Sequence, residues 1–215
     1  PDLFALWRES EGRLGQHLHL PLQSGSNEIL RRMARRCTVE RYTELVEQAR
    51  AAIPDLTVTT DIIVGFPGET DAHWQETVAF CQQMDFAHMH IFSYSARHGT
   101  AAARMDQQIA PEVKRRRSRE LHRIAGDSKT RCLERFVGQV RPILCEGEGV
   151  PGVSGGIRYS GLTDNYLRCV VDAPAGLSLE NRIVPVELKS IDVDTFRGEL
   201  TAETLASLTP QIATA

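Results

Sequence analysis

TTDIIVGFPGET, residues 59–70, begins with β-branched and apolar residues around a single aspartate, Asp61, and ends in a glycine-rich turn. Continuous apolar character predicts a strand buried on both faces, as in a parallel sheet. HLHLPLQSGS, residues 17–26, repeats the pattern, because an apolar strand again gives way to polar residues and glycine. In parallel α/β domains, ligands bind beyond the carboxyl ends of the strands. The two segments therefore predict a ligand site at one edge of a parallel sheet.

Strand and helix patterns alternate around these two motifs. Thr38 and Thr70 are expected to cap helices through their side-chain oxygens, and Pro111 suits the first turn of a long helix. The predicted strands cover 16–22, 56–64 and 88–94, and the predicted helices cover 27–33, 38–53, 70–84 and 111–135. Residues 1–15 give no assignment. The alternation is typical of a parallel α/β sheet or barrel.

The sequence changes character after Phe136. Short β-rich runs, separated by Gly- and Pro-rich turns, cover 137–144, 166–171 and 183–191. Such runs predict a small all-β barrel of about 60 residues. The expected regions are an α/β part over 1–135, a β-barrel over 136–200 and a frayed tail over 201–215.

Composition limits the functional classes. The chain has 215 residues, 41% of them hydrophobic and 25% charged, which is ordinary for a globular protein. No apolar run approaches the roughly 20 residues of a membrane span. Five scattered cysteines without a C-x-x-C pair exclude a zinc ribbon and predict reduced thiols in a cytoplasmic protein. Because the chain begins at Pro1 rather than methionine, we expect it to be a segment of a longer polypeptide.

Charge is unevenly distributed along the chain. The net charge is −3, yet residues 114–135 hold nine Lys or Arg and three Asp or Glu. A basic helix can neutralise the phosphates of a nucleic acid. The same pattern also fits a solvated helix face, and the sequence leaves both interpretations open.

The first motif supplies polar side chains for a ligand. Gln23, Ser24 and Ser26 follow the predicted strand, and their side chains can donate to and accept from a ribose or a carboxylate. Arg35 lies twelve residues beyond Gln23, and a helix between them could return it to the same edge. A guanidinium there would pair with two carboxylate oxygens at once.

The second motif supplies backbone groups. Gly65 and Gly68, on either side of Phe66, allow a flat ligand to approach the backbone closely, so that backbone groups could pair with an adenine edge. Glu69 either faces the ligand or, the more frequent role for such a residue, holds the loop or the following helix. Asp61 needs a partner if it is buried, and it could organise the site.

The third strand is followed by further candidates. Tyr94, Arg97 and Thr100 lie in the loop after this strand, where they could contact a substrate. His88 and His90 share a strand face, but no third ligand is evident, so packing or hydrogen bonding is the preferred interpretation. No metal ligand set is predicted.

Four segments together resemble the radical S-adenosylmethionine methylthiotransferases: HLPLQSGS (19–26), LRRMARR (30–36), TTDIIVGFPGET (59–70) and YSARHGTAAARM (94–105). Residues 17–105 resemble the second half of the radical barrel of that family, and 137–199 are similar to its TRAM domain, a small β-barrel that engages RNA. The resemblance implies that Gln23, Ser24 and Arg35 face the ribose and carboxylate of S-adenosylmethionine. Residues 65–69, including Phe66 and Glu69, would form the adenine-side loop.

The family resemblance also implies a reaction and partners. Its members insert sulfur and then a methyl group at a carbon of a tRNA adenosine near the anticodon, or of a ribosomal protein aspartate. Residues 94–100 most resemble the branch acting on N6-threonylcarbamoyladenosine, and the isopentenyladenosine branch is the alternative. The implied partners are the tRNA anticodon stem-loop and an N-terminal region of the same polypeptide. A non-catalytic RNA-binding protein remains a second hypothesis.

Three departures from the family pattern bear on activity. The C-x3-C-x2-C motif for the 4Fe-4S cluster is absent, so the cluster ligands would lie outside this chain, and the chain alone is expected to be inactive with no catalytic residue of its own. Cys37 replaces a usual aromatic, and Ala101 a common proline. Residues 137–199 carry six basic and nine acidic residues, so RNA binding would depend on 114–135 instead.

Overall fold

The computed structural model describes residues 2–10, 12–152 and 155–208. It divides into two compact units: residues 1–14 with 18–132, and residues 15–17 with 133–215. We call the first the α/β unit and the second the barrel unit. Among the described residues, no helix combines the length and apolar character that crossing a membrane requires.

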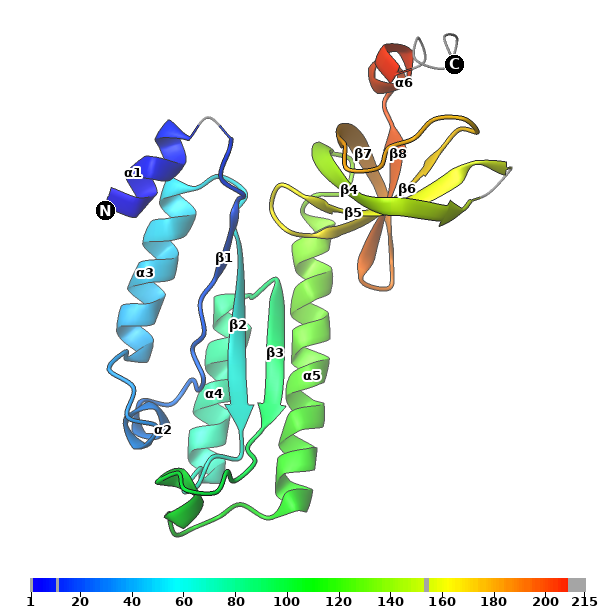
Figure 1. The fold of residues 1–215 in the computed structure, drawn as a ribbon. Coiled ribbons are helices and arrows are strands. Elements are labelled where there is room, and N and C mark those ends of the chain that lie inside the picture. The colour runs from blue at the N-terminus through cyan, green and yellow to red at the C-terminus, as the bar shows by residue number, and fades with distance from the viewer. Residues whose placement is uncertain (1, 11, 153–154, 209–215) are drawn as a thin grey trace. The chain divides into compact units, whose positions relative to one another are not determined.

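The α/β unit is built on a three-stranded sheet with strand order β1-β2-β3 (Figure 1). Its strands are β1 (His17–His19), β2 (Thr57–Val64) and β3 (His88–Ser93). β2 and β3 are parallel, as the βα alternation predicts, and their register pairs Thr59 with His88 and Val64 with Ser93. The helices are α1 (Asp2–Glu9), α2 (Asn27–Arg32), α3 (Val39–Ala52), α4 (Asp71–Met84) and α5 (Pro111–Glu134), with a short 3-10 turn η1 (Ala102–Arg104).

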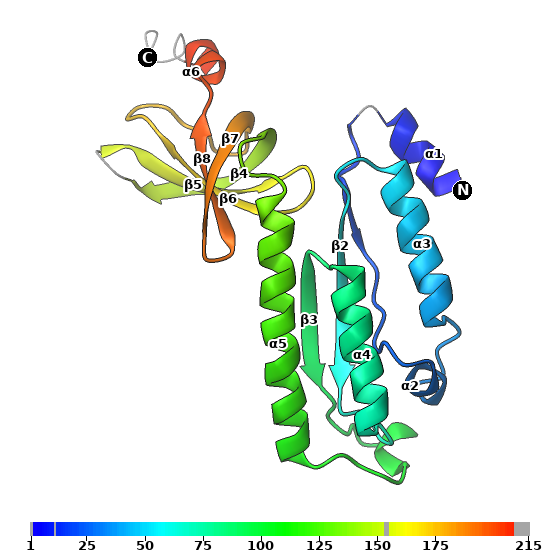
Figure 2. The same cartoon turned by 180° about the vertical axis from the view of Figure 1, so that it is seen from behind.

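Alternate residues of β2 face opposite sides of the sheet, because side chains in a strand alternate. Val58, Ile62 and Val64 are buried in the core, where helix residues such as Tyr42, Val46, Trp74 and Cys81 also lie. Asp61 and Ile63, on the other side, are only partly buried. Figure 1 looks onto this open face, with α4 behind the sheet, and Figure 2 shows α4 in front. The expectation of burial on both faces is therefore wrong for the open face, which the described helices do not cover.

Both predicted helix caps are confirmed. Thr38 Oγ1 accepts a hydrogen bond from the Arg41 amide at 3.4 Å. Thr70 Oγ1 accepts from the His73 amide at 3.2 Å, while His73 Nδ1 accepts from the Thr70 amide, so the two residues form a capping box. These bonds satisfy amides that the first turn of a helix leaves unpaired. In the segment that the sequence left unassigned, α1 forms and Phe4 is buried.

The barrel unit closes five strands in the order β4-β5-β6-β8-β7. They are β4 (Val140–Pro151), β5 (Ile157–Thr163), β6 (Arg168–Ala173), β7 (Ile183–Asp192) and β8 (Thr195–Leu200). Neighbouring strands are antiparallel except β6 and β8, which are parallel. Tyr159 and Phe196 are fully buried inside. The predicted all-β barrel is confirmed.

The sequence missed β5 and β8, because glycine is depleted in strands and each contains one. Gly161 allows β5 to lie close to β4, because a Cβ on this residue would overlap the carbonyl oxygen of Leu144 on β4. Residues 202–208, inside the predicted tail, form helix α6 (Ala202–Leu208). Thr204 Oγ1 of this helix donates to the Pro185 carbonyl at 3.1 Å. The remainder of that segment, 209–215, lies outside the described residues.

Thiol reactivity offers a direct check of the two cores. Cys37 is exposed, whereas the other four cysteines are buried. Burial raises the pKa of Cys81 to about 12, of Cys145 to about 11 and of Cys169 to about 12. The thiolate is the reactive form, so near neutral pH we expect one thiol to react rapidly with an aromatic disulfide reagent and the others only on unfolding. A Cys37→Ser variant should lose the fast phase, and any fast-reacting thiol that remains in it would contradict the buried assignments.

Candidate functional site

A cavity of about 470 Å³ opens at the carboxyl ends of β2 and β3. It lies within the α/β unit and on the open face of the sheet, where the strand-end motifs predict a ligand site. Five of the candidate site residues line it, together with Asp61: Gln23, Phe66, Tyr94, Arg97 and Thr100. The remaining lining residues are Ile63, Phe92, Ser93, Ser95 and Ala102.

Gln23 is placed by a strained backbone. Its φ of 81° lies in the left-handed region, which is uncommon for a residue other than glycine. The Gln23 amide donates to the Asp61 carbonyl at 2.8 Å, and the Ile63 amide donates to the Gln23 carbonyl at 2.9 Å. These two bonds extend the sheet by one parallel bridge to Ile62. The bridge fixes the backbone of Gln23 beside the cavity.

Ser24 and Ser26 are fully buried and do not line the cavity. Ser24 Oγ lies 3.3 Å from Thr77 Oγ1 of α4 and accepts from the Ser26 amide at 3.2 Å. Between them, a Cβ on Gly25 would lie 2.7 Å from Thr77 Cα, so glycine is needed for the loop to approach α4. The Ser24 side chain therefore stabilises the loop against α4. A cofactor contact by either serine remains a prediction.

Glu69 forms a buried ion pair with Arg117 of α5. The Arg117 Nη1–Glu69 Oε1 distance is 2.6 Å, and the side chains are 3% and 1% exposed. Glu69 Oε1 also accepts from the Gly65 amide at 3.1 Å, and Arg117 Nη2 donates to Asp71 Oδ1 at 2.7 Å. Burial raises the pKa of the Glu69 carboxyl, while the Arg117 guanidinium opposes that shift. This network favours the loop-holding role for Glu69.

Sequence reasoning missed Arg117 because it stands among four consecutive basic residues. A signal was nevertheless present in its helical spacing. Leu121 and Ile124 follow it by four and seven residues, and both are buried. Residues with this spacing share one helix face, so Arg117 belongs to the face that packs on the core. For this residue, the solvated-face interpretation of the basic helix is wrong.

The loop after β2 forms one wall of the cavity. Gly65 and Gly68 have φ values of 75° and 83°, and the Gly68 amide donates to the Gln107 carbonyl at 3.0 Å. Phe66 is buried and packs edge-to-face against Tyr94, with ring centroids 5.3 Å apart. Among the described residues, the buried Tyr94 hydroxyl has no hydrogen-bond partner. An unpartnered buried hydroxyl is costly, which favours a polar ligand beside this wall.

Arg35 does not join the cavity. It is exposed beyond the end of α2, and its amide donates to the Leu30 carbonyl. Arg32 reaches the loop instead: its Nε donates to the Pro67 carbonyl at 3.0 Å. The expected return of Arg35 to the strand-end edge is not seen in the described structure, and its contact with a carboxylate remains a prediction.

Arg97 and Thr100 lie in an exposed loop over the cavity. Thr100 Oγ1 donates to the Arg97 carbonyl at 2.8 Å and accepts from the Ala103 amide at 3.3 Å. These bonds shape the loop, and both Arg97 and Thr100 are among the residues that line the cavity. The structure thus brings together Tyr94, Arg97 and Thr100, as the sequence predicts for a substrate-facing loop, although no contact with a substrate is tested.

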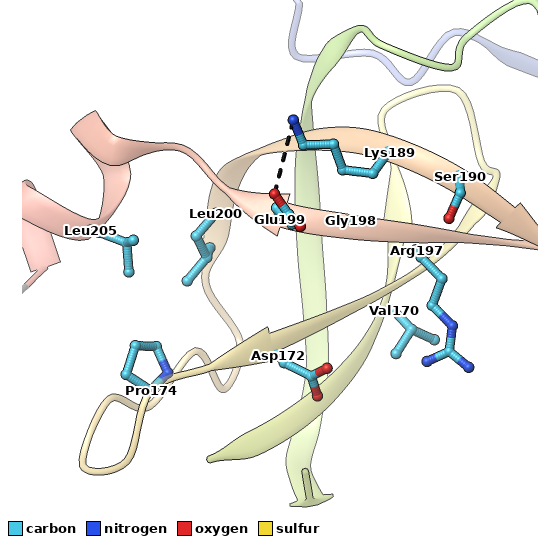
Figure 3. A pocket seen from close by; sticks show the side chains of 10 residues that line it. All are labelled: Val170, Asp172, Pro174, Lys189, Ser190, Arg197, Gly198, Glu199, Leu200 and Leu205. Atoms are coloured by element: carbon cyan, nitrogen blue, oxygen red, sulfur yellow. Dashed lines mark ion pairs between the residues drawn. The ribbon is translucent and has the colours of Figure 1, made fainter. Parts of the chain in front are cut away.

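The barrel unit has a separate cavity of about 500 Å³ (Figure 3). Its charged side chains are paired with opposite charges. Lys189 contacts Glu187 at 2.7 Å and Glu199 at 3.9 Å, and Arg197 contacts Asp192 at 2.6 Å. Paired charges present little net potential to an anionic ligand. The cavity of the α/β unit is therefore the better candidate site.

The chain is similar in sequence to known proteins. Residues 3–81 match the sequence profile of the Radical SAM superfamily. This segment belongs to the radical SAM superfamily. Two relatives named tRNA-2-methylthio-N(6)-dimethylallyladenosine synthase, from Geobacillus thermodenitrificans and Geobacillus kaustophilus, are each 38% identical to the chain over 196 residues. The alignments cover 90% of this chain but only 36% of each relative, so the chain spans a minor part of their length.

A solved structure with a weaker likeness is that of coproporphyrinogen III oxidase from Escherichia coli, described as a radical SAM enzyme. It has a TM-score of 0.48 at 16% identity and covers 75% of this chain and 44% of its own. The fold assignment rests instead on the matched profile and on the strand order and barrel closure described above.

The two cofactors that the radical SAM family implies fit this chain differently. The cavity offers an amide, an aromatic wall and an unpartnered hydroxyl, a set that fits an amino-acid-bearing nucleoside such as S-adenosylmethionine. An iron–sulfur cluster needs several thiolates together. In the part of the chain that the structure describes, no cysteine belongs to a group of three or more metal-ligating side chains. The residues present do not fit the cluster.

Proposed function

We propose that this chain is the part of a radical SAM tRNA methylthiotransferase that holds S-adenosylmethionine, and that the substrate is a tRNA adenosine with an N6-dimethylallyl group. The observation that carries the proposal is the strand-end cavity, which gathers Gln23, Phe66 and Tyr94 from three chain segments. The 38% identity to the tRNA-modifying relatives supports it.

Each of these residues has a role that its position supports. The side-chain amide of Gln23 would donate hydrogen bonds to, and accept them from, the ribose or the carboxylate of S-adenosylmethionine. The edge-to-face pair of Phe66 and Tyr94 would flank the adenine, and free backbone groups of residues 65–68 would pair with its edge. The Glu69–Arg117 pair would keep this loop in place. Bound S-adenosylmethionine would supply the methyl group for transfer.

The relatives favour the isopentenyladenosine branch, which was the alternative in the sequence-based prediction. Their names specify the dimethylallyl (isopentenyl) nucleoside, whereas residues 94–100 led to threonylcarbamoyladenosine as the first choice. One observation keeps threonylcarbamoyladenosine as a second candidate. Arg97 lines the cavity, and a guanidinium suits the carboxylate that this nucleoside carries and the dimethylallyl one lacks.

Nucleoside analysis distinguishes the two branches. In a strain lacking the gene that encodes this chain, tRNA should lose the methylthio group from the dimethylallyl nucleoside, as measured by liquid chromatography and mass spectrometry. The threonylcarbamoyl nucleoside serves as the internal control and should keep any methylthio group it carries. Loss from the threonylcarbamoyl nucleoside alone would reverse the assignment, and no loss from either would contradict the proposed reaction.

Ligand binding tests the site itself. A Phe66→Ala change should weaken binding of S-adenosylmethionine to the purified chain about tenfold, because an aromatic contact with a base contributes about 1–3 kcal/mol. Isothermal titration calorimetry measures this, with circular dichroism to verify folding. Val137→Ala, at an exposed position in the barrel unit, is the control and should leave the affinity unchanged. Equal affinity of both variants would argue against the aromatic wall as the adenine site.

A further inference from the structure

Three potential metal ligands meet on the open face of the sheet. His19 from β1, Asp61 from β2 and His90 from β3 each offer one ligand atom, and these atoms all lie within 4.8 Å of one another. His19 Nε2 lies 3.5 Å from Asp61 Oδ2. The group is accessible, since the His19 and Asp61 side chains are 41% and 25% exposed.

The sheet backbone sets this arrangement. Asp61 and His90 are direct partners in the parallel register of β2 and β3. The Leu20 amide donates to the Thr59 carbonyl at 2.8 Å, which places the end of β1 beside the same part of β2. The three ligands therefore stand on rigid strands rather than on loops. Rigid elements hold ligand geometry more precisely than loops do.

A fourth side chain orients His19. Thr59 Oγ1 lies 3.0 Å from His19 Nδ1, within hydrogen-bond distance. A histidine whose Nδ1–H donates a hydrogen bond keeps Nε2 unprotonated and able to bind a metal, so Thr59 Oγ1 would be the acceptor in the metal-bound state. The other ring nitrogen of His19 is Nε2, the atom that faces Asp61. Thr59 thus occupies the position that supporting residues take in metal sites.

We propose that His19, Asp61 and His90 bind a divalent transition-metal ion. Two imidazoles and one carboxylate are a donor set for zinc, iron(II) or cobalt(II), and three protein ligands leave coordination positions open for water or another oxygen donor. Asp61 also lines the cavity, so the open positions would face a bound molecule there. The site differs from a cysteine-held cluster in ligand type, and it does not rest on the proposed function.

The sequence alone pointed away from such a site. In the sequence, His88 and His90 have no evident third ligand nearby. In the structure, the side chains that approach His90 come from β2 and β1, 29 and 71 residues earlier in the chain. His88 instead packs edge-to-face against His90, with centroids 4.6 Å apart.

Cobalt(II) titration of the metal-stripped chain tests the proposal, because cobalt reports its ligands through visible absorption. We expect one cobalt ion per chain, displaced by zinc, which binds such sites more tightly than cobalt does. His90→Asn and Asp61→Asn should each weaken binding by tenfold or more. Thr59→Val should weaken it about tenfold, the usual size of a supporting-residue effect.

The control is His122→Asn. His122 is an exposed histidine of α5 whose Nδ1 lies 2.7 Å from the Ser118 carbonyl oxygen, outside the three-ligand group. This variant should bind cobalt as the unchanged chain does. No saturable absorption, or equal weakening by His122→Asn and His90→Asn, would overturn the proposal. Circular dichroism of each variant separates loss of binding from loss of folding, and Thr59→Val tests the site with all three ligands intact.

Discussion

Replacing Arg117 with methionine is expected to lower the free energy of unfolding of the α/β unit by about 3–5 kcal/mol. The change removes the partner of a carboxylate that is almost fully buried, and a buried charge without a partner is far more costly than the pair. It also removes the bond from Arg117 to Asp71. Urea unfolding measured by tryptophan fluorescence isolates this unit, because both tryptophans, Trp7 and Trp74, belong to it.

Two variants give this prediction its controls. Arg116→Met removes the neighbouring arginine, which is 63% exposed and 3.6 Å from Asp71, so it should change stability by less than about 1 kcal/mol. Adding Glu69→Gln to Arg117→Met should restore part of the loss, because the unpaired charge is gone. A loss below about 1 kcal/mol for Arg117→Met would show that the pair is not buried as described.

The loss should also depend on pH. Burial raises the folded-state pKa of Glu69 above its unfolded value, and without Arg117 only the weaker effects of the Gly65 amide and His73 oppose that shift. A carboxyl with a raised folded-state pKa binds protons more readily in the folded state, so stability rises as pH falls through that pKa. The difference between Arg117→Met and the unchanged chain should therefore shrink at lower pH.

The barrel unit should lose about 3–5 kcal/mol on Phe196→Ala. Phe196 is fully buried in β8, and its truncation would leave a cavity that the closed strands cannot fill by collapse. Labelling of Cys145 and Cys169 as a function of urea measures the opening of this unit, since both thiols are buried in it. Ile183→Ala, at a site 69% exposed, should shift the midpoint little. Equal midpoints for the two variants would contradict the assigned core.

Features encoded by nearby residues were predictable from the sequence. Three local patterns each predicted the observed element: the apolar run of β2, the capping threonines and the change to short β-rich runs near residue 136. The position of Arg35 depends on a turn that the local pattern does not reveal. α2 ends at Arg32, and Ala34 adopts a φ of 57°, so the chain turns away before Arg35.

Features that depend on distant pairing were not predictable. Glu69 and Arg117 are 48 residues apart, and nothing local distinguishes Arg117 from the arginines beside it except its helix face. The grouping of His19, Asp61 and His90 needs the register of three strands, which a single sequence does not give. The glycine of β5 is likewise explained only by the neighbouring strand that it accommodates.

The alternation of β2 divides this strand into two sets of positions with different tolerance to change. Substitutions at Val58, Ile62 and Val64 would be felt as altered stability, because these side chains belong to the core. Substitutions at Thr59, Asp61 and Ile63 would instead change ligand binding at the cavity or at the metal-ligand group. A combinatorial library for new ligand specificity could therefore randomise the positions of β2 on the open face while the core positions of the same strand stay fixed.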